Sequence, residues 1–112
     1  MEDIQIIENT IDEITTLEEL NKILAENTNV LVNFYAPWCP PCRGLDMEIR
    51  KLKHLPILKI AKVNKDVAQE LFEKFEIYNL PTLKLYINSD EKTTLLGYST
   101  NHVQNILQLI MS

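Results

Sequence analysis

The sequence has little cysteine, little glycine and no long apolar run. It contains 2 cysteines and 2 glycines in 112 residues. So few glycines argue against a flexible or low-complexity chain. No apolar run approaches the ~20 residues that a membrane-spanning helix needs. With 46% hydrophobic residues, the composition is that of an ordinary globular domain.

Length and charge narrow the class of protein further. A chain of 112 residues suffices for one domain with a real core, but not for two. The net charge of −5 argues against nucleic acid and against anionic membrane surfaces as partners. The chain opens with Met1, Glu2 and Asp3, which are acidic where a secretory signal carries positive charge. A cytoplasmic localisation is therefore the expectation.

The two cysteines, Cys39 and Cys42, are separated by two residues. A structural disulfide between them closes a very small loop and constrains little of the unfolded chain. In a reducing compartment such a pair is more often catalytic or metal-binding. A metal site needs about four ligands, and no third or fourth is evident: His54 and His102 are isolated and expected at the surface. A cluster shared between two chains is the alternative.

Hydrophobic periodicity and turn residues predict alternating strands and helices. Thr16 and Glu19 predict a capping box at the first helix, and Asp66 with Gln69 predicts another. The order is β-α-β-α-β-α-β-β-α, as in one α/β domain. The expected strands are Ile4–Glu8, Val30–Ala36, Ile57–Val63, Thr82–Asn88 and Lys92–Leu96. The expected helices follow Thr16 to about Asn27, run from Pro40 to about His54, follow Asp66 to Phe75 and cover Asn101–Met111.

The position of the cysteines favours thiolate chemistry. Cys39 lies where a buried strand ends and a helix begins, so the helix N-terminus and the nearby cation of Arg43 stabilise a thiolate. Cys42 is one turn further along and within reach of a mixed disulfide on Cys39. Pro40 and Pro41 fit the first helical turn and stiffen the loop. The spacing makes Cys39 the attacking cysteine and Cys42 the resolving one.

Several segments resemble the thioredoxin family. Val32–Cys42, which ends in WCPPC, is similar to its strand and active-site signature, and Leu80–Thr82 is similar to its cis-proline loop. Lys62–Asp66 and Gly97 match further landmarks. The resemblance covers nearly the whole chain. It implies a thioredoxin fold, an α/β fold with a central mixed sheet flanked by helices on both faces, in a single domain over residues 1–112.

The resemblance also implies a substrate surface beside the two sulfurs. Pro81, with a cis bond after Leu80, would lie against the sulfurs and present backbone groups of Leu80 to a substrate chain. Trp38, Leu80, Pro81 and Gly97 would form an apolar contact surface, and Tyr98 would narrow its groove. The alternative for Trp38 is a core tryptophan.

The activity implied by the family is that of a thiol–disulfide oxidoreductase. It would reduce protein disulfides by cycling Cys39 and Cys42 between dithiol and disulfide. It would bind no cofactor and no metal, act as a monomer, and receive electrons from a thioredoxin-reductase-like flavoprotein. Pro40 departs from the usual Gly-Pro dipeptide, so a disulfide oxidase or isomerase is one alternative. A redox-inactive binding or scaffold module is the other, although modules that lose catalysis commonly lose a cysteine.

Asn33 occupies the place where thioredoxins usually hold a buried aspartate. An amide does no acid–base chemistry near neutral pH, so we expect slower activation of Cys42 and slower release of the mixed disulfide, although losing a negative charge lowers the cysteine pKa values. With asparagine at position 33, Lys62 is expected to lack the acidic partner that the family usually provides. Its positive charge would then act on the cysteines or reach solvent. Asp46, one turn after Cys42, is an alternative base, but a surface ion pair with Arg50 is the preferred expectation.

Overall fold

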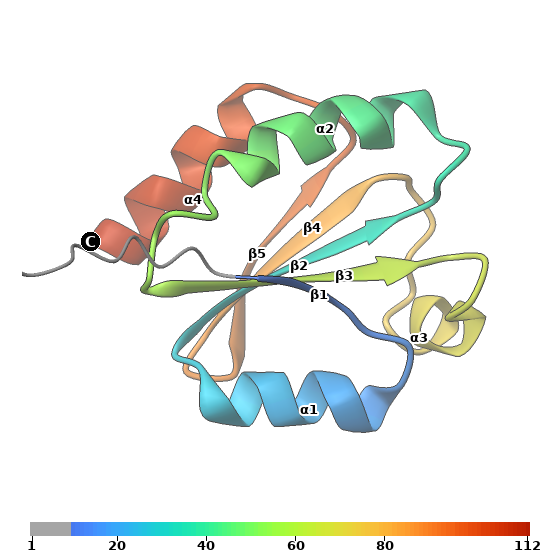
Figure 1. Ribbon diagram of the computed structural model, residues 1–112, viewed down its shortest axis with the longest axis horizontal. Helices are drawn as coiled ribbons and strands as arrows, with labels where there is room; N and C mark the ends of the chain where they lie inside the picture. The colour runs from blue at the N-terminus through green and yellow to red at the C-terminus, as the bar shows by residue number, and fades with distance from the viewer. Residues whose placement is uncertain (1–9) are drawn as a thin grey trace, which may run out of the picture.

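The computed structural model describes residues 10–112, which form one mixed sheet with helices on both faces (Figure 1). The strand order is β1-β3-β2-β4-β5. Strand β2 pairs with β3 in parallel and with β4 in antiparallel orientation. The strands are β1 (Ile11–Glu13), β2 (Asn29–Tyr35), β3 (Leu58–Asn64), β4 (Thr82–Ile87) and β5 (Asp90–Leu96). The helices are α1 (Leu17–Glu26), α2 (Pro40–Arg50), α3 (Gln69–Lys74) and α4 (Asn101–Met111).

Strand β2 divides the core into two layers. Successive side chains of a strand point to opposite faces, so Val30, Val32 and Phe34 pack on the side of α1 and α3, whereas Leu31 lies on the side of α2 and α4. All four are 0% exposed, which confirms the predicted central strand buried on both faces. By the same alternation Asn33 lies on the α2 face. This places its amide below the helix that carries the cysteines.

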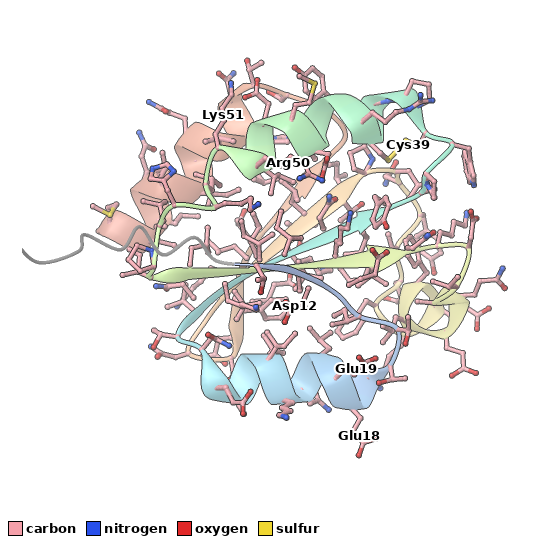
Figure 2. The ribbon with its side chains drawn as sticks, in the orientation of Figure 1. Asp12, Glu18, Glu19, Cys39, Arg50 and Lys51 are labelled. Atoms are coloured by element: carbon pink, nitrogen blue, oxygen red, sulfur yellow. A yellow bond between two sulfur atoms is a disulfide. The ribbon has the colours of Figure 1, made fainter. Side chains whose placement is uncertain are left out.

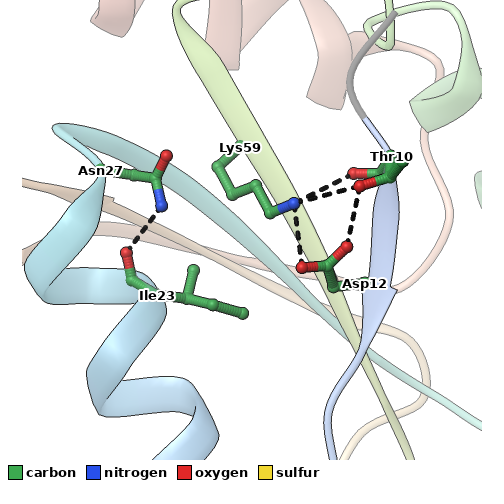
Figure 3. A network of polar contacts seen from close by, with 5 residues as sticks. All are labelled: Thr10, Asp12, Ile23, Asn27 and Lys59. Atoms are coloured by element: carbon green, nitrogen blue, oxygen red, sulfur yellow. Dashed lines mark hydrogen bonds and ion pairs between the residues drawn. The ribbon is translucent and has the colours of Figure 1, made fainter.

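Helix α1 begins and ends as predicted. The hydroxyl of Thr16 accepts a 3.2 Å hydrogen bond from Glu19 N, and the Glu19 carboxylate accepts one of 3.1 Å from Thr16 N. This is the predicted capping box. At the other end, Asn27 Nδ2 donates a 2.9 Å hydrogen bond to Ile23 O (Figure 3). None of the described helices is both long and apolar enough to cross a membrane.

The first described strand, β1, was not predicted. The expected strand at Ile4–Glu8 lies outside the described residues, whereas Ile11–Glu13 pairs in parallel with β3. Lys59 of β3 fastens this edge strand (Figure 3): its Nζ lies 2.9 Å from Asp12 Oδ2 and 3.4 Å from Thr10 O. Strand β1 therefore forms through its pairing with β3. It is too short for its sequence to show an alternating hydrophobic pattern.

Helix α2 ends about one turn before His54, so its predicted length is wrong. After Arg50 the backbone changes from i−4 to i−3 hydrogen bonds, as in Lys51 N to Glu48 O (3.2 Å) and Leu52 N to Ile49 O (2.9 Å). Tighter turns of this kind commonly close α-helices.

The predicted capping box at Asp66 is also wrong, because α3 begins later. Its N-cap is Ala68, which makes no side-chain cap. The Asp66 carboxylate instead accepts a 3.0 Å hydrogen bond from Trp38 Nε1, and Asp66 N donates one of 2.9 Å to Asn64 Oδ1. The polar side chains of this segment therefore stabilise the loop before α3 and do not cap the helix.

The predicted hairpin is present with a shorter loop. Asn88 and Ser89 have φ of 54° and 68°, as in the two-residue turns that suit the twist of paired strands. Strand β5 consequently begins at Asp90 instead of Lys92. The last helix, α4, has the predicted bounds Asn101–Met111.

Candidate functional site

The redox pair lies at the N-terminal end of α2. Cys39 is the N-cap, and its Sγ accepts a 3.3 Å hydrogen bond from Cys42 N. A disulfide joins the two cysteines, whose Cα atoms are 5.2 Å apart. Pro40 and Pro41 occupy the first helical positions, where no N–H partner is needed. The predicted junction of strand and helix at Cys39 is confirmed, and Figure 2 shows it at the opposite end of α2 from Arg50.

The opposite wall of the site comes from the loop before β4. The Leu80–Pro81 peptide bond is cis, and Leu80 packs against the buried cluster of Ala36, Cys39 and Cys42. Pairing of Phe34 with Thr82 between β2 and β4 holds this loop beside the cysteines. Pro81 itself is buried, and its carbonyl accepts a 2.8 Å hydrogen bond from Gly97 N. The register of the sheet thus brings the two predicted motifs together.

Large apolar side chains are exposed around the pair. Trp38 is 58% exposed, Leu96 56% and Tyr98 47%, so the alternative of a core tryptophan at position 38 is wrong. The Tyr98 ring lies over α2, where a methyl group on Gly44 would stand 3.3 Å from Tyr98 Cε1. Leu96 was not predicted to belong to this surface, because in the sequence it has the pattern of an ordinary outward-facing strand position.

Beneath the pair, Lys62 has an acidic partner, contrary to expectation. Its Nζ lies 3.9 Å from Glu13 Oε2 and 4.9 Å from the centroid of the Tyr35 ring. Tyr35 also donates a hydrogen bond from its hydroxyl to Glu13. Burial, followed by this bond to Glu13, raises the pKa of Tyr35 above its ordinary value, so the phenol stays neutral. The partner was missed because Glu13 belongs to the unpredicted strand β1.

A cavity of about 90 Å³ lies between Cys42 and the sheet. Asn33 is 3% exposed, and its Oδ1 has no hydrogen-bond partner among residues 10–112. Asp46 forms the predicted ion pair with Arg50, at 2.7 Å. The lining includes Asn33, Tyr35, Cys42, Arg43, Asp46 and Lys62. Carboxylate, ammonium and amide groups thus meet on the inner side of the resolving position.

One histidine is not where it was expected. His54 is exposed as predicted, but His102 is only 8% exposed. Its Nε2 lies 3.2 Å from Leu96 O and 3.1 Å from Gly97 O, so this nitrogen carries the hydrogen and donates to both carbonyls. Within the described part of the chain, no group of three or more His, Cys, Asp or Glu side chains could hold a metal ion.

Comparison with known proteins agrees with this architecture. The family model described as Thioredoxin matches residues 12–110. The chain belongs to the thioredoxin family. It is similar to a thioredoxin of Mycoplasma pneumoniae, with 31% identity over 101 residues that cover 89% of this chain and 97% of the relative. With Cys39 and Cys42 joined at the N-terminus of α2, this thioredoxin-family protein is a thiol–disulfide oxidoreductase whose redox group is that disulfide.

Two further similarities concern the enzyme class and the fold. A protein disulfide-isomerase of Drosophila melanogaster is 39% identical over 79 residues, which cover 65% of this chain but 16% of that protein. The crystal structure of thioredoxin from Trypanosoma brucei brucei superposes with a TM-score of 0.84 at 22% identity, over 97% of both chains. The predicted thioredoxin fold is therefore confirmed, while the relatives include both thioredoxins and isomerases.

Proposed function

We propose that this thioredoxin-family protein reduces disulfide bonds in other proteins. The Cys39 thiolate attacks one sulfur of the substrate disulfide, which forms a mixed disulfide and releases the other substrate sulfur as a thiolate. The Cys42 thiolate then attacks Cys39 Sγ, which releases the second substrate thiolate and leaves the Cys39–Cys42 disulfide. The observation that carries the proposal is the position of Cys39 as N-cap of α2.

The surroundings of the two sulfurs support this division of roles. Cys39 is 6% exposed and Cys42 2%, so an incoming disulfide meets Cys39 first. The Cys39 sulfur also accepts the N–H of Cys42 and lies at the positive end of the helix. Both features stabilise a thiolate. Arg43, in the first turn of the same helix, adds positive charge nearby.

The exposed apolar residues suit an unfolded or extended substrate segment. Trp38, Leu96 and Tyr98 supply the contact area, with Gly97 between the last two. We propose that the backbone of Leu80 pairs with the substrate chain, since this residue packs against the cluster that contains the two cysteines. Main-chain pairing gives affinity with little dependence on sequence. A surface of this kind serves many protein disulfides.

Continuous reduction needs an electron donor. We propose a flavoprotein similar to thioredoxin reductase as the partner that restores the dithiol, and a reducing compartment such as the cytoplasm as the place of action. A monomer suffices for the cycle, because one chain supplies both cysteines and the docking residues.

The reduction potential tests the direction of transfer. Equilibration with glutathione is expected to give about −270 mV, as in reducing thioredoxins, whereas about −180 mV or higher would indicate the isomerase or oxidase alternative. Acceleration of insulin reduction by dithiothreitol tests the scaffold alternative, which predicts none. Cys39→Ser should abolish exchange, and Cys42→Ser should accumulate mixed disulfides. The opposite pattern would overturn the assigned roles.

A further inference from the structure

The second step of the cycle needs a proton acceptor for Cys42, and Asn33 offers none. Resolution requires the Cys42 thiol to lose its proton as it attacks the mixed disulfide. Asn33 lies below Cys42 on the α2 face of β2, and its side chain carries no acidic group. The proton must therefore leave by another route.

We propose that Asp46 accepts this proton, through water held in the cavity that Asn33 and Cys42 line. The inference rests on the proposed role of Cys42 as the resolving cysteine. Asp46 lies four residues after Cys42 on α2, so both side chains project from the same face of the helix. Both line the cavity of about 90 Å³.

The Asp46 carboxylate is available for this role. Its Oδ2 pairs with Arg50 at 2.7 Å, and its side chain is 30% exposed. Within residues 10–112, no hydrogen bond is made by its other oxygen, Oδ1. Glu13, by contrast, is held by Tyr35 and Lys62 and does not line the cavity. Asp46 is thus the one carboxylate among the described residues that borders both the resolving sulfur and solvent.

The polar lining of the cavity is suited to water. A cavity needs about 10–15 Å³ to hold one water molecule, and the water needs two to four polar partners; about 90 Å³ is available here. The Asn33 Oδ1 is buried without a donor, so it accepts a hydrogen bond from such a water. Asp46 accepts a second one, and Lys62 donates. Asn33 thereby positions the water instead of taking the proton itself.

The step balances without a further reagent. Cys42 Sγ–H gives its proton to the bridging water, which passes one to Asp46, while the Cys42 sulfur forms a bond to Cys39 Sγ. The bond between Cys39 and the substrate sulfur breaks, and the substrate leaves as a thiolate. Asp46, which is partly exposed, then releases the proton to solvent.

Charged or titratable groups face Asp46 from its own helix and from the neighbouring strands. Arg43 and Arg50 flank it on α2, Lys62 faces it from β3, and Tyr35 faces it from β2 as a neutral phenol. Behind Tyr35, the negative charge of Glu13 is partly offset by Lys62. The neighbourhood of the carboxylate is therefore predominantly cationic.

Asp46→Asn separates proton transfer from a simple charge effect. A nearby negative charge raises the pKa of a thiol, so its removal alone speeds attack by Cys42. Loss of a proton acceptor slows it. General-base groups contribute about 10²-fold or more, and solvent replaces part of this, so we expect resolution to slow by about tenfold at neutral pH.

The measurement follows the two steps separately. Reduced protein is mixed with oxidised glutathione, and the mixed disulfide is counted by acid quenching and mass spectrometry. Asp46→Asn is expected to accumulate it, and its resolution rate should rise by about tenfold per pH unit over the range in which the Cys42 thiol is mostly protonated. The wild-type rate should vary less steeply. Resolution that is unchanged or faster in Asp46→Asn would overturn the proposal.

Two matched variants control for charge and for the ion pair. Glu48→Gln removes the same charge from α2 at a carboxylate that pairs with Lys51 at 2.6 Å, away from the cavity. Arg50→Gln removes the partner of Asp46 but keeps its carboxylate. Both should resolve within about twofold of wild type, since surface ion pairs contribute little. Slowing by Glu48→Gln equal to that by Asp46→Asn would overturn the proposal.

A rescue and a trap complete the test. Asn33→Asp in the Asp46→Asn background returns a carboxylate to the cavity and should restore most of the lost rate; no recovery would contradict transfer through this cavity. Cys42→Ser should trap the mixed disulfide whether or not Asp46 is present. If Cys42→Ser fails to trap it, the proposed function fails. If it traps and Asp46→Asn resolves normally, only the role of Asp46 fails.

Discussion

Trp38 donates a 3.0 Å hydrogen bond from its indole Nε1 to the carboxylate of Asp66. The bond ties the exposed ring next to Cys39 to the loop that precedes α3. It fixes the orientation of a large docking residue before any substrate arrives. Because Trp38 is the only tryptophan in the sequence, tryptophan fluorescence reports on the surroundings of this one ring.

Asp66→Ala should therefore loosen the indole and weaken substrate docking. Ordering one large side chain on binding costs about 0.5–1.5 kcal/mol, which corresponds to a roughly two- to tenfold lower kcat/KM for insulin. Fluorescence anisotropy of Trp38 should fall as well. Asp66→Asn keeps an acceptor oxygen and should behave almost as wild type. Equal losses in both variants would show that the charge, not the hydrogen bond, matters.

The two glycines should respond in opposite ways to alanine. Gly44 lies inside α2, where alanine is favoured by about 1 kcal/mol, and the half-exposed Tyr98 ring at 3.3 Å from the new methyl can shift. We expect Gly44→Ala to raise the free energy of unfolding by about 0.5 kcal/mol. Gly97 has φ of 71° with nothing within 4 Å, so Gly97→Ala should lower it by about 1–2 kcal/mol for backbone reasons. Urea denaturation measures both.

His102 should act as a brace for the loop that carries Gly97. Removing its donor leaves the carbonyls of Leu96 and Gly97 without this partner, at about 1–3 kcal/mol for buried polar groups. His102→Ala should lose this much stability and speed hydrogen exchange in the loop. His102→Gln places an amide N–H near the position of Nε2 and should retain part of the stability. Asn is too short and is expected to resemble Ala.

The capping box of α1 predicts a pH dependence of stability. Hydrogen bonds from Thr15, followed by those from Thr16, lower the pKa of Glu19 from its ordinary value of 4.5. A group with a lowered folded-state pKa stabilises the fold above its unfolded pKa, and this contribution is lost as the pH falls through the folded pKa. The urea midpoint of wild type should therefore drop more between about pH 5 and pH 3 than that of Glu19→Gln, which does not titrate.

Asn33→Asp should destabilise the protein in a pH-dependent way. At 3% exposure the new carboxyl favours its neutral form, so its folded-state pKa lies above the unfolded value of about 3.9. Stability should match wild type below about pH 4 and fall by about 1–3 kcal/mol at neutral pH. Asn33→Ala, which does not titrate, should show no such trend. A loss that is equal at both pH values would contradict a buried environment.

Local patterns were enough to predict the start of the cysteine helix, the strand before it and the start of α1. The continuous apolar run of β2, the prolines at the start of α2 and the capping box at Thr16 are encoded within a few residues each. The loop of Leu80 and Pro81 could be paired with the cysteines only by resemblance. Its actual position follows from the antiparallel register of β2 with β4.

The features that the sequence did not predict depend on interactions between segments far apart in the chain. Strand β1 has three residues and depends on pairing with β3, so Glu13 could not be recognised as the partner of Lys62. Asp66 has the sequence pattern of a helix cap, but its carboxylate accepts the hydrogen bond of Trp38 instead. His102 has the sequence pattern of a surface helix residue. Its burial depends on the Leu96 and Gly97 carbonyls, which come from a different segment and accept its hydrogen bonds.

The pairing of Phe34 with Thr82 holds the loops of the site in position independently of the disulfide. It joins the end of β2 to the beginning of β4, so the loops of Cys39 and Leu80 face each other whether or not the sulfurs are bonded. Oxidation and reduction can then alternate many times without the groove being rebuilt at each turnover. Substitutions between the cysteines could therefore adjust the driving force of the exchange while leaving its choice of substrates intact.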